Sequence, residues 1–286
     1  APILGFVEKL ESAGVAVAAP LPLLPLINGE PGTGAGAHIA DINPSTGVPF
    51  AWVACADAAE IEHAIEVAAF ASKLWRGAPF DERARRLARL AERVHEQAEA
   101  LASLIALEQG KPFAEALALE VLPSLDHLRF LSRHARELTQ GEPIEPRHPL
   151  YAHKRALYLY DPLGVVVLVT SSSLPFAQPL IQTASALAMG NAVILKPSLS
   201  TPLTALRVGE LCAEAGFPAG LVNVVPATPE DTLRLVSHDK VAKVFVTGTP
   251  ETGQSIMTIA ACAPRPVVLS LGGKHPSIVA ADCAVL

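Results

Sequence analysis

The sequence predicts an α/β fold, in which a Rossmann-like, doubly wound parallel sheet is preceded by an α-helical N-terminal segment. Two observations predict it. From about residue 163 onward, short apolar runs without a polar face alternate with helical stretches, which is typical of a parallel sheet covered by helices on both sides. From about residue 58 to 141, apolar residues recur at steps of three, four or seven, which indicates amphipathic helices.

Composition and charge argue against several classes of protein. Half of the 286 residues are apolar and 17% are charged, which predicts a large core and excludes general disorder. The net charge of −6 and the 5% of aromatic residues argue against nucleic-acid binding, which needs surplus positive charge and stacking rings. The four cysteines include no Cys-x-x-Cys pair and the histidines show no ligand spacing, so we expect a reducing compartment and no metal site.

One apolar stretch, residues 15–27, resembles a targeting segment at first sight. Prolines interrupt it, and the lysine upstream of it, Lys9, lies between Glu8 and Glu11. A signal peptide has a basic lead and an unbroken apolar run, and a membrane helix needs about 20 apolar residues. We therefore expect no membrane contact and a cytoplasmic location.

Residues 1–141 are predicted to form an N-terminal part of coil, short strands and helices that packs on the region following it. Turn-forming residues stand at 28–30 and 43–47. A long middle helix is predicted with Asp81 as its N-cap and Gly110 as its C-terminal stop. Its charged face carries Arg85, Arg86, Arg89, Glu92, Arg93 and Glu96. We interpret this face as solvated and crossed by ion pairs between successive turns.

Residues 142–162 and 163–286 are predicted to form two further parts. The first begins with a proline-rich connector, after which residues 151–160 alternate loosely and predict an exposed strand. The second, residues 163–286, is the Rossmann-like region. Its strands are predicted at 163–170, 192–196, 221–225, 241–247 and 267–271, and its helices at about 179–189, 201–215, 229–237 and 251–261.

Sheets of this kind bind ligands at the carboxyl ends of their strands. One strand runs into Gly248, Thr249 and Gly253 and then into a helix, whose unpaired N–H groups and positive dipole end suit a pyrophosphate. Another strand places Lys196 at its carboxyl end. A plain strand-to-helix turn or a solvated strand end explains each signal alone, whereas the two together favour a nucleotide site.

Motifs in a fixed order over nearly the whole chain carry a family resemblance. They are Asn28-Gly29, Asn43-Pro44-Ser45-Thr46-Gly47, Glu108-Gln109-Gly110-Lys111-Pro112 with Glu115, Pro162-Leu163-Gly164-Val165, Gly190-Asn191 through Lys196-Pro197-Ser198, Gly216 through Val225, Thr247-Gly248-Thr249 with Gly253, and Leu271-Gly272-Gly273-Lys274. In this order they resemble the N-terminal and coenzyme-binding portion of the aldehyde dehydrogenase superfamily.

This resemblance implies that NAD or NADP binds in a variant Rossmann domain. It implies that Lys196 hydrogen-bonds the adenosine ribose and that Gly248, Thr249 and Gly253 lie at the pyrophosphate. It also implies a homo-oligomer, because residues 151–160 resemble the family's oligomerisation strand.

The ribose-binding part of the site departs from the family pattern. The family often has a glutamate three residues after the lysine, which chelates the two ribose hydroxyls, and this chain has Leu199 there. The change either admits NADP or lowers the affinity for both nucleotides. Ser198 and Ser200 are placed to compensate in part.

The family's catalytic positions are altered as well. Its chemistry uses a cysteine nucleophile, an oxyanion-hole asparagine and a glutamate base. The glutamate position holds Ser270, which has no basicity at neutral pH, and the asparagine position holds Ser173, a shorter donor. The family's cysteine falls beyond the position of Leu286, and we interpret Cys283 as a chance cysteine.

Three hypotheses are consistent with these patterns. The chain is an NAD(P)-binding module, truncated before the catalytic cysteine or one half of a split enzyme, and impaired in catalysis on its own. It is alternatively a non-catalytic homologue that acts as an interaction or oligomerisation subunit. In the third hypothesis, a partner chain supplies the catalytic half of an active enzyme. Ser173 and Ser270 argue against this hypothesis, because a partner could supply the cysteine but could not replace these two residues. A sheet without its catalytic domain exposes apolar surface, which favours a homo-oligomer or a partner chain covering it.

Overall fold

The computed structural model describes residue 3 and residues 21–151 and 153–283. The apolar stretch at 15–27 therefore lies partly outside the described residues, as do residues 1–2 and 4–20 of the predicted N-terminal coil. The strands are β1 (Leu21–Leu23), β2 (Leu26–Ile27), β3 (Glu30–Pro31), β4 (His38–Asn43), β5 (Val48–Ala54), β6 (Glu142–Ile144), β7 (Ala156–Tyr158), β8 (Val165–Val169), β9 (Ala192–Lys196), β10 (Val222–Val224), β11 (Val241–Gly248) and β12 (Val267–Leu271). The helices are α2 (Ala58–Arg76), α3 (Phe80–Glu96), α4 (Ala98–Gln109), α5 (Phe113–Ala116), α6 (Leu122–Thr139), α7 (Ala177–Ala188), α8 (Pro202–Glu214), α9 (Pro229–Ser237) and α10 (Pro250–Ala260), with a π-helical turn η1 (Leu117–Val121) and a 3-10 turn η2 (Pro149–Tyr151).

The main sheet has the strand order β12-β11-β8-β9-β10-β2-β3 in the described part of the chain. Its first five strands run parallel, and β8 lies in the middle of them with every residue buried. The chain proceeds from β8 through β9 to β10 on one side and then places β11 and β12 on the other. The strand order therefore reverses between β8 and β11, which is the topological switch point of a doubly wound sheet. The predicted fold class is confirmed.

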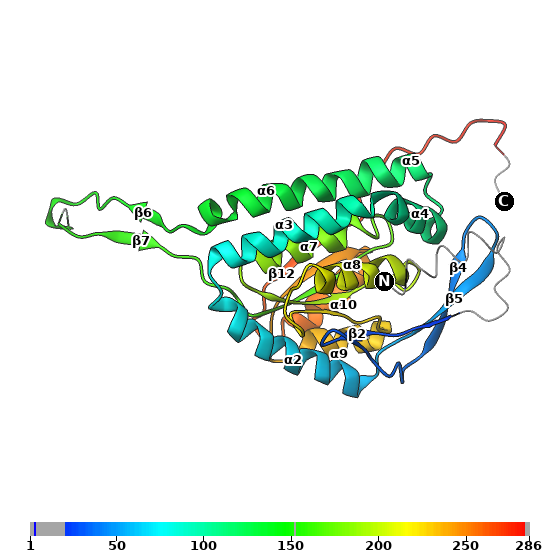
Figure 1. The fold of residues 1–286 in the computed structure, drawn as a ribbon, viewed down its shortest axis with the longest axis horizontal. Coiled ribbons are helices and arrows are strands. Elements are labelled where there is room, and N and C mark those ends of the chain that lie inside the picture. The colour runs from blue at the N-terminus through cyan, green and yellow to red at the C-terminus, as the bar shows by residue number, and fades with distance from the viewer. Residues whose placement is uncertain (1–2, 4–20, 152, 284–286) are drawn as a thin grey trace.

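Helices cover both faces of this sheet. On one face α7 and α8 pack on the strands, and α3 and α6 form a further layer over them (Figure 1). On the other face lie α2, α9 and α10 (Figure 1). No described helix is long and apolar enough to cross a membrane.

The predicted middle helix is wrong in two respects. It is two helices, α3 and α4, because Gln97 leaves helical geometry (φ −113°, ψ 15°). The Gln97 side chain accepts a hydrogen bond from Arg207 of α8 at 2.6 Å. Asp81 is not the N-cap, because α3 begins at Phe80, with Pro79 in the N-cap position, and Asp81 lies inside its first turn. The carboxylate of Asp81 pairs instead with Arg136 of α6 at 2.5 Å. An exposed aspartate in a first turn can form such a pair as readily as a cap.

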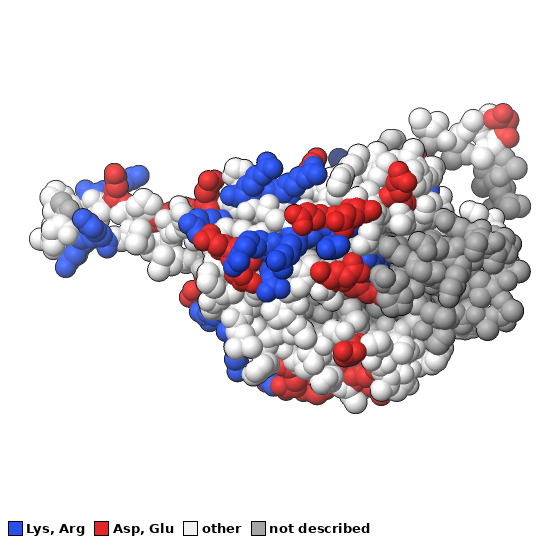
Figure 2. Space-filling model, in the orientation of Figure 1, with Lys and Arg blue, Asp and Glu red and all other residues white. Residues whose placement is uncertain are grey.

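The charged face of α3 is solvated as predicted. Its arginines pair with glutamates on the same helix, for example Arg93 with Glu96 at 2.8 Å. Figure 2 shows Lys and Arg side chains interleaved with Asp and Glu over α3 and α6. One arginine of this helix behaves differently, because Arg83 is buried and donates to the carbonyl oxygens of Arg76 (2.9 Å) and Ala188 (3.3 Å). It thereby holds the C-terminal ends of α2 and α7 together.

The segment predicted as a connector and one strand is a β-hairpin. Residues 142–144, which we expected to be part of the connector, pair antiparallel with residues 156–158, so that Pro143 lies opposite Leu157. The predicted strand at 151–160 is correspondingly shorter. The hairpin projects from the body of the protein (Figure 1), with Leu157 and Tyr158 about 60% exposed.

The C-terminal stop of α4 provides a test of the fold. Gly110 adopts a left-handed conformation (φ +78°), and a Cβ added there would lie 2.8 Å from Cγ of Pro44. We expect Gly110→Ala to lower the free energy of unfolding by about 2–4 kcal/mol, because backbone strain and crowding add. The measurement is urea denaturation.

The matched control is Gly47→Ala, since Gly47 also has a positive φ (+69°) and nothing within 4 Å of an added Cβ. It should cost only the backbone strain of about 1–2 kcal/mol. Equal losses in the two variants would contradict the contact with Pro44.

Candidate functional site

The strand register brings the predicted binding residues to one edge of the sheet. Leu269 of β12, Val246 of β11, Val169 of β8 and Lys196 of β9 lie side by side across the four strands. The remaining predicted residues follow these positions along the chain and are Ser173, Ser198, Gly248, Thr249, Gly253 and Ser270. Gly248 and Ser270 lie in the last residues of β11 and β12, and the others lie beyond the carboxyl ends of their strands, on both sides of the switch point. Geometry thus joins residues that sequence spacing leaves far apart.

Lys196 lies at the carboxyl end of β9 and is partly buried. Its carbonyl oxygen accepts a hydrogen bond from Thr170 at 3.1 Å, which ties the ends of β8 and β9 together. Burial lowers the pKa of the Lys196 ammonium, and nearby Cys55 acts in the opposite direction. Within the part of the chain that the structure describes, Lys196 forms no ion pair. Its ammonium is therefore suited to the oxygens of a ligand.

The loop after Lys196 leads into α8, whose first residues are bound by a side chain from another helix. Ser198 and Ser200 bond to each other through their hydroxyls at 2.9 Å. Thr201 occupies the N-cap of α8 without a side-chain capping bond. Glu108 of α4 caps this helix instead, accepting from the backbone N–H of Leu203 at 2.5 Å and from the N–H and hydroxyl of Thr204. The sequence suggested Glu108 only as part of a motif.

The turn after β11 has a different organisation. Thr249 is the N-cap of α10, and its hydroxyl accepts from the N–H of Thr252 at 3.3 Å. Gly253 lies one helical turn after Thr249 and is buried. A Cβ added to Gly253 would lie only 2.7 Å from Cδ1 of Leu271. The structure thus gives Gly253 a role in packing α10 closely on β12. A pyrophosphate contact at Gly248, Thr249 and Gly253 stays a prediction.

The serine segment after β8 is fixed by the motif at residues 108–112. Gln109 donates from Nε2 to the carbonyl oxygens of Ser172 (2.8 Å) and Ser173 (2.9 Å), and Lys111 donates to that of Ser173 at 3.2 Å. The Ser173 hydroxyl is exposed and bonds to the hydroxyl of Ser171 at 2.7 Å. The backbone here is therefore rigid, although the side chains on it are small.

A buried ion pair supports this segment from below. Lys111 Nζ lies 2.5 Å from Oε1 of Glu120, which is fully buried. The other oxygen, Oε2, accepts from the backbone N–H groups of Phe176 (2.8 Å) and Ala177 (3.2 Å) at the start of α7. Glu120 stands in the π-helical turn η1, and such turns often occur at functional sites. The sequence analysis missed Glu120, because a glutamate inside a helical stretch carries no signal of burial.

Gln178 of α7 spans the switch point. Its Nε2 donates to the hydroxyl of Thr247 on β11, and its Oε1 accepts from the N–H of Ser171 at 3.3 Å. Ser270 is the cross-strand neighbour of Thr247 and is exposed. We missed Gln178, since no sequence pattern marks it. Among the described residues, neither the hydroxyl of Ser173 nor that of Ser270 has a basic side chain as a hydrogen-bond partner, so no general base activates either hydroxyl as a nucleophile.

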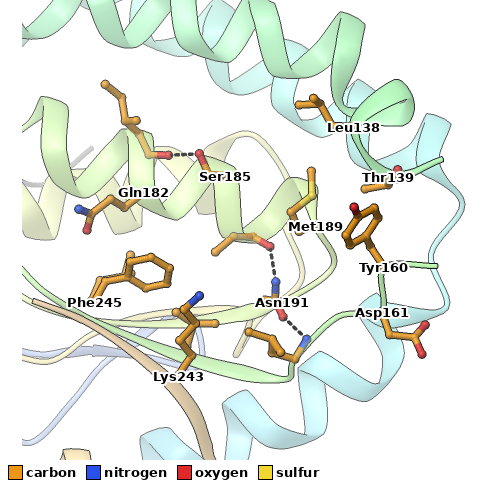
Figure 3. A pocket seen from close by; sticks show the side chains of 15 residues that line it. Leu138, Thr139, Tyr160, Asp161, Gln182, Ser185, Met189, Asn191, Lys243 and Phe245 are labelled. Carbon is orange, nitrogen blue, oxygen red and sulfur yellow. Dashed lines mark hydrogen bonds between the residues drawn. The ribbon is translucent and has the colours of Figure 1, made fainter. Parts of the chain in front are cut away.

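Metal ligands and cavities in the described part of the chain lie apart from the predicted binding residues or are not found there. Within residues 21–151 and 153–283, no cluster of His, Cys, Asp and Glu could hold a metal ion. A cavity of about 510 Å³ lies between α7 and the strands β8 and β11 (Figure 3). Gln182 of α7 and Met189, the residue that follows this helix, line one wall, and Lys243 and Phe245 of β11 line another (Figure 3). None of the predicted binding residues lines this cavity.

Comparison with known proteins gives a consistent result. The model of the aldehyde dehydrogenase family matches residues 32–285. Phenylacetaldehyde dehydrogenase of Pseudomonas fluorescens is 40% identical over 246 residues, which are 84% of this chain and 49% of that protein. Betaine aldehyde dehydrogenase of Vibrio vulnificus (strain YJ016) is 33% identical over 257 residues, 90% of this chain and 52% of that protein. The chain spans about half the length of the curated relatives it matches.

Solved structures are similar over the same extent. Lactaldehyde dehydrogenase from Escherichia coli has a TM-score of 0.83 and 31% identity, covering 90% of this chain and 53% of that one. Aldehyde dehydrogenase from Brucella melitensis biovar abortus 2308 has a TM-score of 0.82 and 30% identity, with the same coverage. A 3,6-anhydro-L-galactose dehydrogenase in complex with NAP has a TM-score of 0.80 and 30% identity, covering 88% and 52%.

The buried pair of Lys111 and Glu120 should be essential for this edge of the sheet. We expect Glu120→Gln to lower the free energy of unfolding by about 3 kcal/mol or more, because it leaves a buried lysine without its counter-charge. Urea denaturation measures the loss. Glu115→Gln, an exposed glutamate one turn earlier, is the matched control and should change stability by about 0.5 kcal/mol at most. A Glu120→Gln variant as stable as this control would show that the pair is dispensable.

Proposed function

Because the chain belongs to the aldehyde dehydrogenase family, we propose that it is the NAD(P)-binding portion of a relative in which aldehyde oxidation is impaired. The observation that carries the first half of this proposal is the position of Lys196. It ends β9 at the carboxyl edge, partly buried and without an ion pair to any residue described. The turn between β11 and α10 leaves the same edge across the switch point. Nucleotides bind to parallel sheets at this position.

The residues present fit a dinucleotide. Lys196 and Ser198 would bind the adenosine ribose, and Gly248 and Thr249 would face the pyrophosphate at the start of α10, where the helix dipole favours an anion. Gly253 would act indirectly, by letting α10 pack closely on β12. Bound NAD(P) would supply the acceptor for a hydride.

The second half of the proposal rests on the two serines. A general base must have a pKa near the operating pH to take a proton from water, and the hydroxyl of Ser270 does not meet this condition. An oxyanion-hole donor must reach the developing charge, and losing one costs about a hundredfold to a thousandfold in rate. Ser173 has the shorter side chain at that position and already bonds to Ser171. A cysteine nucleophile would not restore activity by itself, because Ser173 and Ser270 would still stand at the positions of the asparagine and the glutamate.

A second candidate function is assembly, which the β6–β7 hairpin favours. The hairpin extends away from the body (Figure 1). The apolar and aromatic side chains that it and the following residues expose are Ile144, Leu150, Tyr151, Leu157, Tyr158, Leu159 and Tyr160. An exposed apolar group of this kind indicates a protein interface. A homo-oligomer or a partner chain would cover it.

Isothermal titration with NAD and with NADP tests the cofactor site. We expect micromolar binding of at least one nucleotide, and at least about a tenfold loss in Lys196→Ala, since a hydrogen bond to a charged group contributes about 1.5–3 kcal/mol. Lys73→Ala, an exposed lysine on α2, is the control and should bind as the wild type does. Addition of phenylacetaldehyde should give no reduced nicotinamide. An absence of heat at millimolar nucleotide would refute the cofactor proposal and leave assembly as the function.

The ribose position allows a gain-of-function test. Leu199 is partly buried, three residues after Lys196. A carboxylate there would accept hydrogen bonds from both ribose hydroxyls, so we expect Leu199→Glu to tighten NAD binding about tenfold. NADP carries a phosphate on one of these hydroxyls, and the new carboxylate should repel it. Titrating both nucleotides into the variant measures the two effects; a parallel gain for both would contradict the placement of the ribose.

A further inference from the structure

A buried carboxyl group in β4 lies outside the site described so far. Asp41 is 1% exposed, and neither of its carboxyl oxygens has a hydrogen-bond partner among the residues that the structure describes. An ionised carboxylate in such a place would be strongly unfavourable. The group that faces Asp41 is another acid, the fully buried Glu108 at the end of α4.

The two acids differ in what surrounds them. Glu108 accepts three hydrogen bonds from Leu203 and Thr204 at the start of α8, where the helix dipole also favours a negative charge. Asp41 has no such donor. Two ionised carboxylates offer only acceptors, whereas one proton on Asp41 turns their repulsion into an O–H···O⁻ bond. We therefore place the proton on the carboxyl group of Asp41, which then donates a hydrogen bond to the carboxylate of Glu108.

Within the part of the chain that the structure describes, the nearby cations are already paired and none of them replaces this proton. Lys111, close to Glu108 in sequence, pairs with Glu120, and Arg207 of α8 pairs with glutamates of its own helix. Ala51, which lies opposite Asp41 on β5, has no charge. Burial first, and then the charge of Glu108, raise the pKa of Asp41 to about 10. Burial also raises the pKa of Glu108, against the hydrogen bonds from Thr204.

The pair connects β4, which belongs to a separate sheet of the order β1-β5-β4, to the carboxyl edge of the main sheet. Glu108 holds the start of α8, and only the short loop 197–201 separates that helix from Lys196. We propose that Asp41 and Glu108 share one proton and together position this loop, so that loss of the proton in alkaline solution weakens nucleotide binding. The second part of this proposal, the effect on nucleotide binding, rests on the function proposed above. Asp41 and Glu108 act here as positioning residues, through the loop.

The direction of the pH effect follows from the raised pKa. Above the ordinary pKa of aspartate, near 4, the unfolded chain has lost this proton and the folded chain still holds it. The stabilisation is complete at low pH, and it is lost progressively as the pH rises towards 10.

Asp41→Asn is the decisive variant, because the asparagine amide donates to Glu108 at every pH. Between pH 7 and 9, the folding equilibrium constant of the wild type should fall about tenfold per pH unit relative to that of Asp41→Asn. Infrared spectroscopy at pH 8 should show a protonated-carboxyl band that the variant lacks. Asp81→Asn, which removes an exposed carboxylate from α3, should behave as the wild type does. Asp41→Val gives the same spectroscopic comparison if Asp41→Asn does not fold.

Nucleotide titration separates positioning from stability alone. Between pH 8 and 10.5, the dissociation constant should rise about fourfold more in the wild type than in Asp41→Asn. Parallel pH profiles for stability, or a carboxyl band that persists in the variant, would overturn the shared proton. A shared proton with parallel nucleotide profiles would overturn the positioning role. Failure of the wild type to bind nucleotide at pH 8 would instead refute the proposed function, and with it the positioning role, while stability and the infrared band still decide the shared proton.

Discussion

Buried glutamates that accept backbone N–H groups hold the functional edge of this protein together. Glu60 accepts from Thr33 at 2.6 Å and Gly34 at 3.1 Å, and Glu108 and Glu120 cap α8 and α7. A buried charge is tolerated only where several donors compensate its lost hydration. Burial alone would raise the pKa of Glu60. The hydrogen bonds from Gly34, Thr33 and Asp57 outweigh this effect and hold the pKa below its ordinary value. Glu120 and Glu108 replace the local side-chain caps that α7 and α8 lack.

The consequence is that the loops at the carboxyl edge depend on residues from the helical N-terminal part. Glu108, Gln109 and Lys111 are close together in sequence, yet they reach the loop after β9 and the loop after β8. A parallel sheet presents both loops at one edge, so a single helix end can hold them. The fold of the family is thus retained at this edge, while the assignment of Ser173 and Ser270 to its catalytic positions stays a prediction.

Some features of the fold and the site could be predicted from residue patterns, and others could not. The strands β9 and β12 and the helix α9 have the predicted boundaries, because apolar runs and flanking turn residues are local properties. The break at Gln97 and the position of Asp81 were not predictable, since both residues bond to partners on other helices. The β6–β7 hairpin was missed in part for the same reason: a strand with a proline needs its partner to be recognised.

The sequence by itself determined the fold class, the order of the strands along the chain and the residue types at each strand end, because hydrophobic periodicity and turn chemistry act over a few residues. It also predicted that Ser270 and Ser173 stand at the family's glutamate and asparagine positions, because such a prediction depends on residue identity and motif order alone. Only the tertiary structure decided which side chains are buried against one another. Asp41 and Glu108 are separated by more than sixty positions, and their need for a common proton arises only when β4 and α4 pack together and exclude water. Burial, unlike periodicity, is a property of the whole chain.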